Sequence, residues 1–251
     1  MSEFSGVNNP KRVLLVGASS TLGREVLKIL PRQIPIWTLG ESPPVFDSGL
    51  LLNHVSVSWE SIADGDILRL SQLPEGNFDL VFVVNGYVST DLQSSVLQEL
   101  ESGIQANLIV PAKVIHWLIE SKRLNSSSEL IVISTSLKHF KVFAHNALYL
   151  NEKMLLETFL KLLRDLTPHR DFPKVRIIRP GHFPSNMNKF KALRVLSYSA
   201  KDIALKIIES TGSDRRYTYH TIPKRLTLLG KISKLVPNRL LTKVLEMLRS
   251  W

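Results

Sequence analysis

The sequence predicts an α/β fold, a doubly wound and mostly parallel sheet, with a basic amphipathic helical extension at the C-terminus. Strand-like and helix-like segments alternate along the chain. Several strand-like segments are nearly continuous apolar runs, such as KRVLLV (11–16), DLVFVV (79–84) and ELIVIS (129–134), which is typical of strands buried on both faces. No internal repeat or low-complexity block divides the chain. One domain is therefore the simplest organisation.

The individual elements follow from local patterns. Short apolar runs predict strands over 11–16, 34–39, 55–57, 79–84, 129–134, 174–178 and 217–221. Apolar residues at three- and four-residue spacing predict helices over 21–30, 97–120, 147–166 and 200–209. Glycine, proline and serine favour a surface connection over 40–53. We expect residues 1–223 to form the domain and residues 224–251 the extension.

Composition limits the possible functions. The chain has 251 residues and 44% hydrophobic content, enough to bury a full core. It contains no cysteine, which excludes disulfides, thiolate metal sites and cysteine nucleophiles. No stretch approaches the roughly 20 apolar residues of a spanning helix, and residues 1–10 lack the apolar core of an export signal. We therefore expect a cytoplasmic protein.

Most of the formal net charge of +10 lies in the C-terminal part. Residues 215–251 contain nine basic residues and a single acid, a net charge of +8. This localisation argues against a general nucleic-acid surface. From Lys224 onward the apolar residues have helical spacing in two halves separated by Pro237. Two interpretations stay open: helices packed on the domain or on a second copy in a homo-oligomer, or an interfacial helix on an anionic membrane at its inner face.

A glycine-containing turn, GASSTLG, joins the first expected strand to the first expected helix. A nucleotide pyrophosphate needs backbone N–H groups and close main-chain approach at such a turn, and the helix N-terminus favours negative charge. The turn therefore predicts a nucleotide site, with a plain strand-to-helix connection as the alternative. Its residues are Gly17, Ser19, Ser20, Thr21, Leu22 and Gly23.

Tyr149 and Lys153 are four residues apart, so they share one face of the helix expected over 147–166. A tyrosine with its ordinary pKa of about 10 exchanges protons poorly near neutrality. A nearby ammonium stabilises the phenolate, and we expect Lys153 to lower the pKa of Tyr149 in this way. The pair then predicts a general acid or base.

Together these segments resemble the short-chain dehydrogenase/reductase family over roughly residues 12–221. GASSTLG is similar to the family's Gly-x-x-x-Gly-x-Gly turn, although Thr21 replaces the middle glycine. Tyr149 and Lys153 match its catalytic pair. Ser136, 13 residues before Tyr149, matches its substrate-orienting serine, with Ser134 as the fallback.

Three further segments add to the resemblance. Asn85 and Gly86 stand where the family has an Asn-Ala-Gly motif beside the cofactor ribose, and Asn107 fits its active-site asparagine. Pro180-Gly181 resembles its Pro-Gly motif beside the nicotinamide carboxamide. Four residues beyond that glycine, Ser185 replaces the commoner threonine.

The resemblance implies a Rossmann-like, NAD(P)-dependent enzyme that interconverts a small-molecule ketone and a secondary alcohol. Tyr149 would transfer the proton, Ser136 would orient the carbonyl, Lys153 would bind the nicotinamide ribose and Asn107 would support a relay water. The alternative is a non-catalytic nucleotide-binding or scaffold protein of the same fold. The segments GASSTLG, NGYVSTDL (85–92), TYHTIP (218–223) and Leu-Val-Pro (235–237) resemble the family branch that includes reductases of polyprenyl-phosphate sugars.

The choice between NAD(H) and NADP(H) stays open. Glu41, just after the second expected strand, argues mildly against a 2′-phosphate, whereas Ser19, Arg24 and Ser42 could help to hold one. We predict no metal, since the histidines lack metal-ligand spacing with carboxylates. A mobile lid over the substrate is expected between residues 183 and 199, carrying Phe190, Leu193 and Val195.

Overall fold

The computed structural model describes residues 10–45, 51–87, 96–139, 144–168, 171–181, 183, 198–235 and 237. Within them, seven strands form one sheet in the order β3-β2-β1-β4-β5-β6-β7, and every neighbouring pair is parallel. The strands are β1 (Val13–Val16), β2 (Ile36–Gly40), β3 (Leu52–Ser56), β4 (Leu80–Val83), β5 (Glu129–Ile133), β6 (Lys174–Pro180) and β7 (Tyr217–Ile222). The predicted doubly wound α/β fold is confirmed.

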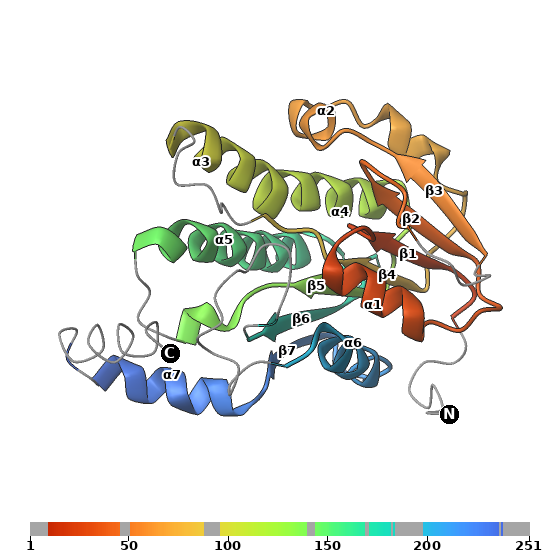
Figure 1. The fold of residues 1–251 in the computed structure, drawn as a ribbon. Coiled ribbons are helices and arrows are strands. Elements are labelled where there is room, and N and C mark those ends of the chain that lie inside the picture. The colour runs from red at the N-terminus through yellow and green to blue at the C-terminus, as the bar shows by residue number, and fades with distance from the viewer. Residues whose placement is uncertain are drawn as a thin grey trace.

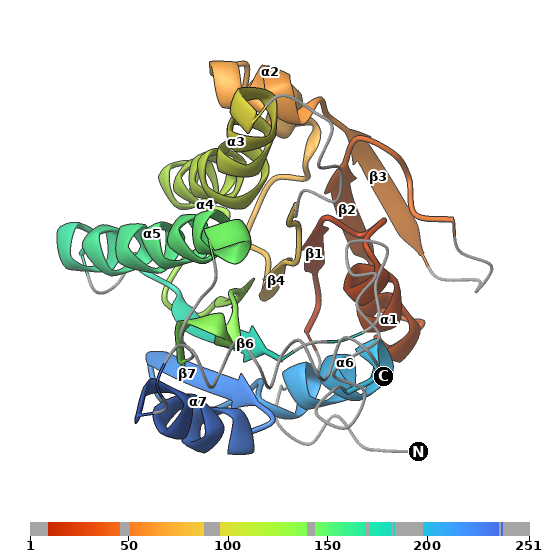
Figure 2. The same ribbon diagram turned by 60° about the vertical axis from the view of Figure 1, so that its left-hand side comes forward.

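Helices cover both faces of this sheet (Figures 1 and 2). On one face lie α2 (Trp59–Asp64), α3 (Val96–Ile104), α4 (Val110–Glu120) and α5 (Ala144–Leu166), and on the other lie α1 (Thr21–Ile29) and α6 (Ala200–Glu209). The side chains of β1 alternate between two apolar clusters. Leu14 and Val16 join the cluster under α4 and α5, and Val13 and Leu15 join the one under α1 and α6. Burial on both faces explains the continuous apolar runs.

The strand order creates a switch point between β1 and β4. From β1 the chain moves outward to β2 and β3, and it then returns to pair β4 with the other side of β1. In open parallel sheets such a point leaves a crevice at the carboxyl ends of the two strands. The segments that follow β1 and β4 begin with Gly17 and Val84.

The long helix predicted over 97–120 is interrupted. A five-residue π-helical turn, η2 (Gln105–Ile109), separates α3 from α4 and contains Asn107. Three other short elements were also not predicted: α2 and the 3₁₀ turns η1 (Leu68–Gln72) and η3 (Ser136–His139). They are too short for a periodic apolar signal.

A buried ion pair links β5 and β6 near the amino ends of the strands. Arg176 on β6 donates from Nε to Glu129 Oε1 on β5 at 2.6 Å, and both side chains are buried. Glu129 Oε2 accepts from the Gly212 backbone at 2.9 Å, while Arg176 also bonds the carbonyl oxygens of Ser213 and Arg215. The pair thus holds the connection that leads into β7.

The first half of the C-terminal extension is a helix, α7 (Arg225–Leu235), which packs against η3 and β7. Its contact with the domain agrees with the packing interpretation for this half. Residues 238–251 lie outside the described residues, so the predicted boundary at 223/224 stays a prediction. In the part of the chain that the structure describes, no helix is both long enough and apolar enough to cross a bilayer.

Candidate active site

The glycine turn after β1 lies against the residue that follows β4. Gly17 has a φ of +83°, and a Cβ built there would lie 2.7 Å from the Asn85 backbone nitrogen. A Cβ at Gly23 would lie 2.6 Å from the carbonyl oxygen of Gly17. Both glycines are therefore needed for the turn to approach β4 and α1 closely.

The N-terminus of α1 is capped from within this turn. Ser20 accepts from the Gly23 backbone N–H at 3.0 Å, and Ser19 is exposed beside it. Thr21 is half-buried, while the Leu22 side chain belongs to the apolar cluster under α1. Because first-turn N–H groups have no partner within a helix, the α1 N-terminus can receive an anion. Leu22 would contribute its main chain only.

Asn85 links β4 to the helices on one face of the sheet. Its Nδ2 donates to the Ala106 carbonyl at 2.8 Å, and its own carbonyl accepts from Lys153 Nζ at 3.1 Å. Its Oδ1 is buried and has no hydrogen-bond partner among the described residues. At Gly86 a Cβ would lie 3.3 Å from Asn107 Oδ1 and 3.4 Å from Lys153 Nζ. The predicted Asn85, Gly86, Asn107 and Lys153 therefore meet at one place.

Asn107 is fully buried in the π-helical turn. Its Oδ1 accepts from the Tyr87 N–H at 2.9 Å, and its Nδ2 donates to the Tyr87 carbonyl at 2.7 Å and to Glu152 Oε2 at 2.7 Å. The extra residue of a π turn re-aims a side chain that a regular helix would direct elsewhere. Here it aims the Asn107 amide at the segment after β4 and at α5.

Tyr149 and Lys153 lie on α5, with the Lys153 ammonium 5.9 Å from the centroid of the Tyr149 ring. Burial lowers the pKa of Lys153 to about 8, partly offset by the negative charge of Glu152. Burial and then Glu152 raise the pKa of Tyr149 to about 12. The pKa of Tyr149 therefore lies above its ordinary value and not below it, contrary to the expected lowering by Lys153, because burial and the acid both raise it.

The two candidate serines have different surroundings. Ser134 Oγ donates to Glu157 Oε1 at 2.6 Å, and Glu157 also holds the Arg179 guanidinium at 2.5 Å. Ser134 thus belongs to a buried polar network between β5, β6 and α5. Ser136 is buried at the start of η3, just past the carboxyl end of β5. The hydroxyl of Ser134 is thus engaged in that network, and the role of Ser136 as the substrate-orienting serine stays a prediction.

The Pro-Gly segment follows the next strand. Pro180 is the last residue of β6 and is buried, and the Gly181 N–H donates to the Ile222 carbonyl on β7 at 2.7 Å. Ser185 lies outside the described residues. The proposed lid, with Phe190, Leu193 and Val195, also lies outside them except for its ends.

Glu41 lies just after β2 and is exposed. Its Oε1 accepts from the Trp59 N–H, the first residue of α2, at 3.4 Å. With Asp66 and Arg69 it borders a shallow hollow beside β3. The Glu41 carboxylate therefore faces the N-terminus of α2. This contact favours neither of the two nicotinamide cofactors, so the choice between them stays open.

One residue of this site was missed by the sequence interpretation. Glu152 is only 3% exposed, and its Oε2 accepts from Asn107. The available signal was an acidic residue directly before Lys153, which the sequence had already placed in the site. The contact with Asn107 is not visible in the sequence. Without it, Glu152 could not be distinguished from an acid on the solvent-exposed face of the helix.

The described residues fit a bound dinucleotide. The N-terminus of α1 can receive a phosphate. The glycine turn that precedes it lies directly against Asn85, where a Cβ at Gly17 would not fit. The buried Asn85 Oδ1 offers an acceptor that no described residue uses, and Lys153 Nζ lies beside the same segment. In the described part of the chain, no group of three histidine or acidic side chains is placed to hold a metal ion.

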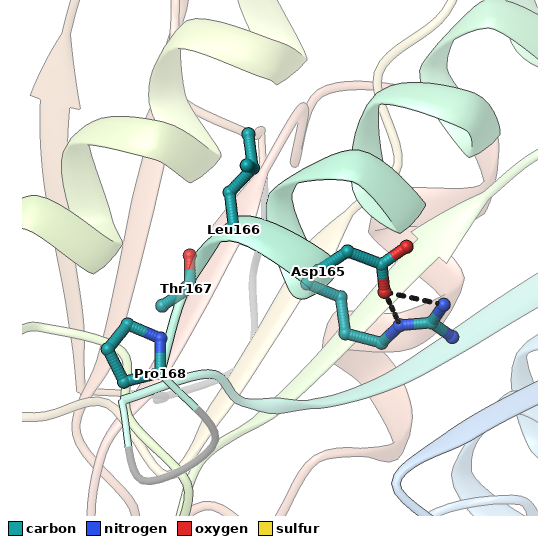
Figure 3. A pocket seen from close by; sticks show the side chains of 5 residues that line it. Asp165, Leu166, Thr167 and Pro168 are labelled. Atoms are coloured by element: carbon teal, nitrogen blue, oxygen red, sulfur yellow. Dashed lines mark hydrogen bonds and ion pairs between the residues drawn. The ribbon is translucent and has the colours of Figure 1, made fainter.

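A second hollow lies at the other end of α5 (Figure 3). It is lined by Arg164, Asp165, Leu166, Thr167 and Pro168. Along a helix this is roughly 22 Å from Tyr149. The hollow is therefore separate from the residues described above.

No family model matches the sequence, and no curated protein matches it. Solved structures do match. A short chain dehydrogenase family protein from Francisella tularensis superposes with a TM-score of 0.68 and 13% identity, covering 84% of this chain and 96% of that one. A short-chain dehydrogenase from Streptomyces avermitilis has a TM-score of 0.64 and 17% identity, and the match covers 94% of this chain and 96% of that one. BdcA, solved in complex with NADPH, has a TM-score of 0.60 and 16% identity, and the match covers 84% of this chain and 92% of that one. The chain thus has the fold of short-chain dehydrogenases.

The close approach of Gly17 to Asn85 can be tested with Gly17→Ala. The positive φ alone costs an alanine about 1–2 kcal/mol, and the clash with Asn85 adds about 1–3 kcal/mol. Gly65→Ala is the matched control, because Gly65 has a φ of +107° but its nearest neighbour would lie 3.8 Å from the new Cβ. Urea unfolding should show the larger loss for Gly17→Ala. Equal losses would mean that the turn does not press on Asn85.

Proposed function

We propose that the chain is an NAD(P)-dependent oxidoreductase of the short-chain dehydrogenase/reductase type, which interconverts a ketone and a secondary alcohol. The observation that carries the proposal is the meeting of Lys153, Asn107 and the Asn85–Gly86 segment beside the glycine turn at the switch point. Tyr149 lies one helical turn from Lys153. The shared fold with solved short-chain dehydrogenases supports the same assignment.

The nicotinamide, when bound, supplies or accepts the hydride. Lys153 would hold its ribose, since the ammonium projects beside Gly86 at the end of β4. Ser136 would donate a hydrogen bond to the carbonyl oxygen of the substrate, and Tyr149 would deliver the proton to that oxygen. Asn107, whose side chain is fully engaged, would support a relay water through its main chain.

Tyr149 carries its proton near neutrality, with a pKa raised to about 12 by burial and then by Glu152. In ketone reduction this phenol would supply the proton, and in alcohol oxidation its phenolate would accept one, so either direction uses the same residue. The rival function, a nucleotide-binding scaffold without catalysis, uses the glycine turn but gives no reason to bury a lysine beside a tyrosine.

Turnover with Tyr149→Phe tests the proposal. Wild type should oxidise NADH or NADPH with at least one member of a panel of ketones that includes sugar and polyprenyl substrates. Removing the hydroxyl should lower kcat about 10²–10⁴-fold, the usual contribution of a general acid, while cofactor binding persists. Tyr219→Phe on β7 is the control. Equal activity of wild type and Tyr149→Phe on a true substrate would refute the assignment.

We further propose that the chain docks on anionic membranes and acts on a lipid-linked or sugar substrate. Three apolar residues share one face of α7 and are exposed: Leu228 (62%), Ile232 (49%) and Leu235 (85%). Lys224 and Lys231 are exposed beside them, in a segment of net charge +8. Each basic residue near such a surface contributes on the order of 1 kcal/mol. Because α7 packs against η3, docking would bring the turn of Ser136 close to the lipid.

Liposome sedimentation tests this docking. The full chain should sediment with vesicles of anionic lipid at low salt, and binding should weaken at high salt as the charges are screened. Replacing Leu228, Ile232 and Leu235 together by serine should abolish it. Serine at three exposed apolar positions elsewhere, Val45, Leu51 and Leu68, should not. Failure of the wild type to bind would make the extension a packing element only.

Self-association, the other predicted partnership, has a candidate surface on α5. Exposed apolar side chains follow one another at seven-residue spacing, Leu148, Leu155 and Leu162. An unpartnered stripe of this kind is suited to pack against a second copy of the helix. Sedimentation equilibrium should show a homo-oligomer that Leu155→Glu dissociates. A monomeric wild type at high protein concentration would contradict this prediction.

A further inference from the structure

The carboxylate of Glu152 is enclosed between α5 and the segment that joins α3 to α4. One oxygen, Oε2, accepts a 2.7 Å hydrogen bond from Asn107 Nδ2. The other, Oε1, is buried and has no hydrogen-bond partner among the described residues. An acid is seldom buried unless it is paired or has a role at a site. Its neighbours on α5, Tyr149 and Lys153, are the residues proposed for catalysis.

The backbone of α3 makes room for this carboxylate. A Cβ at Gly103 would lie 2.7 Å from Glu152 Oε1 and 3.3 Å from its Oε2. Glycine in the last turn of a helix costs about 1 kcal/mol relative to alanine. With no side chain at position 103, the Glu152 carboxylate lies against the α3 backbone while it accepts from Asn107.

We propose that Glu152 is a positioning residue of the active site, which orients the Asn107 amide and places a negative charge beside Lys153 and Tyr149 so that both keep their protons. The proposal rests on the function proposed above, and it names a residue that acts on Asn107, Tyr149 and Lys153 rather than on the substrate.

The orienting role follows from the hydrogen bonds of Asn107. Its amide could be flipped end over end without changing its shape, and only its partners define its direction. Glu152 accepts but does not donate when ionised, so it requires Nδ2 on its side. Oδ1 is thereby directed to the Tyr87 N–H. Glu152 and the two backbone groups of Tyr87 therefore require the same direction of the Asn107 amide.

The electrostatic role follows from the groups that face Glu152. From α5 these are Lys153 and Tyr149, while α3 and the π-helical turn contribute Gly103 and the Asn107 amide, neither of which titrates. Burial raises the pKa of Glu152, and the Asn107 hydrogen bond and Lys153 act against that rise. Its charge in turn raises the pKa of Lys153 and of Tyr149. Removing the charge should lower both.

The main test replaces Glu152 by glutamine, which keeps the shape and an acceptor for Asn107 but removes the charge. The pH dependence of kcat/KM for ketone reduction should move to lower pH by about one unit on its alkaline side, the size expected for a nearby charge. Asn151→Asp, an exposed change on the same helix, should leave the profile in place. An unmoved profile in folded Glu152→Gln would overturn the electrostatic role.

A measurement without substrate separates this inference from the proposed function. Ultraviolet titration of tyrosinate, taken as the difference between a protein and its Tyr149→Phe counterpart, follows Tyr149 alone. In the Glu152→Gln background this difference should appear at lower pH. If it appears while no ketone is turned over, the positioning role stands and the reaction assignment fails. If it is unchanged, the inference fails whatever the activity.

A stability cycle with Gly103→Ala checks the geometry even if Glu152→Gln folds poorly. Alone, Gly103→Ala should lower Tm, because the new Cβ collides with the carboxylate. In a Glu152→Ala background the same change should raise Tm, since alanine favours the helix. Non-additivity of this kind reports contact between the two positions. Additive effects would show that Glu152 is not seated against Gly103, which would overturn the proposal.

Discussion

The arrangement of the site depends on the hydrogen bonds of the Asn107 side-chain amide. It bonds both backbone groups of Tyr87 after β4 and the carboxylate of Glu152 on α5. Three segments distant in the sequence are thereby held at fixed separation at the carboxyl end of the sheet. The bond to Glu152 is buried and the two to Tyr87 are partly buried. Losing the Glu152 partner would leave a buried polar group unsatisfied, at a cost of about 1–3 kcal/mol. The π-helical turn is the local distortion that makes this geometry possible.

The charges around this amide balance one another. Burial acts against the ionised forms of Lys153, Glu152 and Tyr149 alike, and an ammonium beside a carboxylate offsets part of that penalty. A buried lysine with a pKa of about 8 needs such a neighbour to remain charged near neutrality. The same carboxylate adds to burial in raising the pKa of the Tyr149 phenol.

The surface around the site is organised by the extension as well as by the sheet. The helix α7 packs against η3, the turn that begins at Ser136, and it exposes apolar and basic side chains on its outer side. The buried pair Arg176–Glu129 lies at the opposite end of the sheet and stabilises the path into β7, from which α7 follows.

The sequence by itself determined the sheet, the helices on its two faces and the order of the candidate motifs, because apolar periodicity and glycine position are local signals. Spacing and resemblance also made Asn85, Asn107, Ser136 and Lys153 candidates for one site, and the structure brings Asn85, Asn107 and Lys153 together. Only the tertiary structure decided that Ser134 belongs to a network with Glu157, that Asn107 stands in a π-helical turn, and that Glu152 faces it across Gly103. It also reversed the expected pKa of Tyr149. These outcomes depend on burial and on partners far apart in the chain, and a residue's neighbours in sequence contain no record of either.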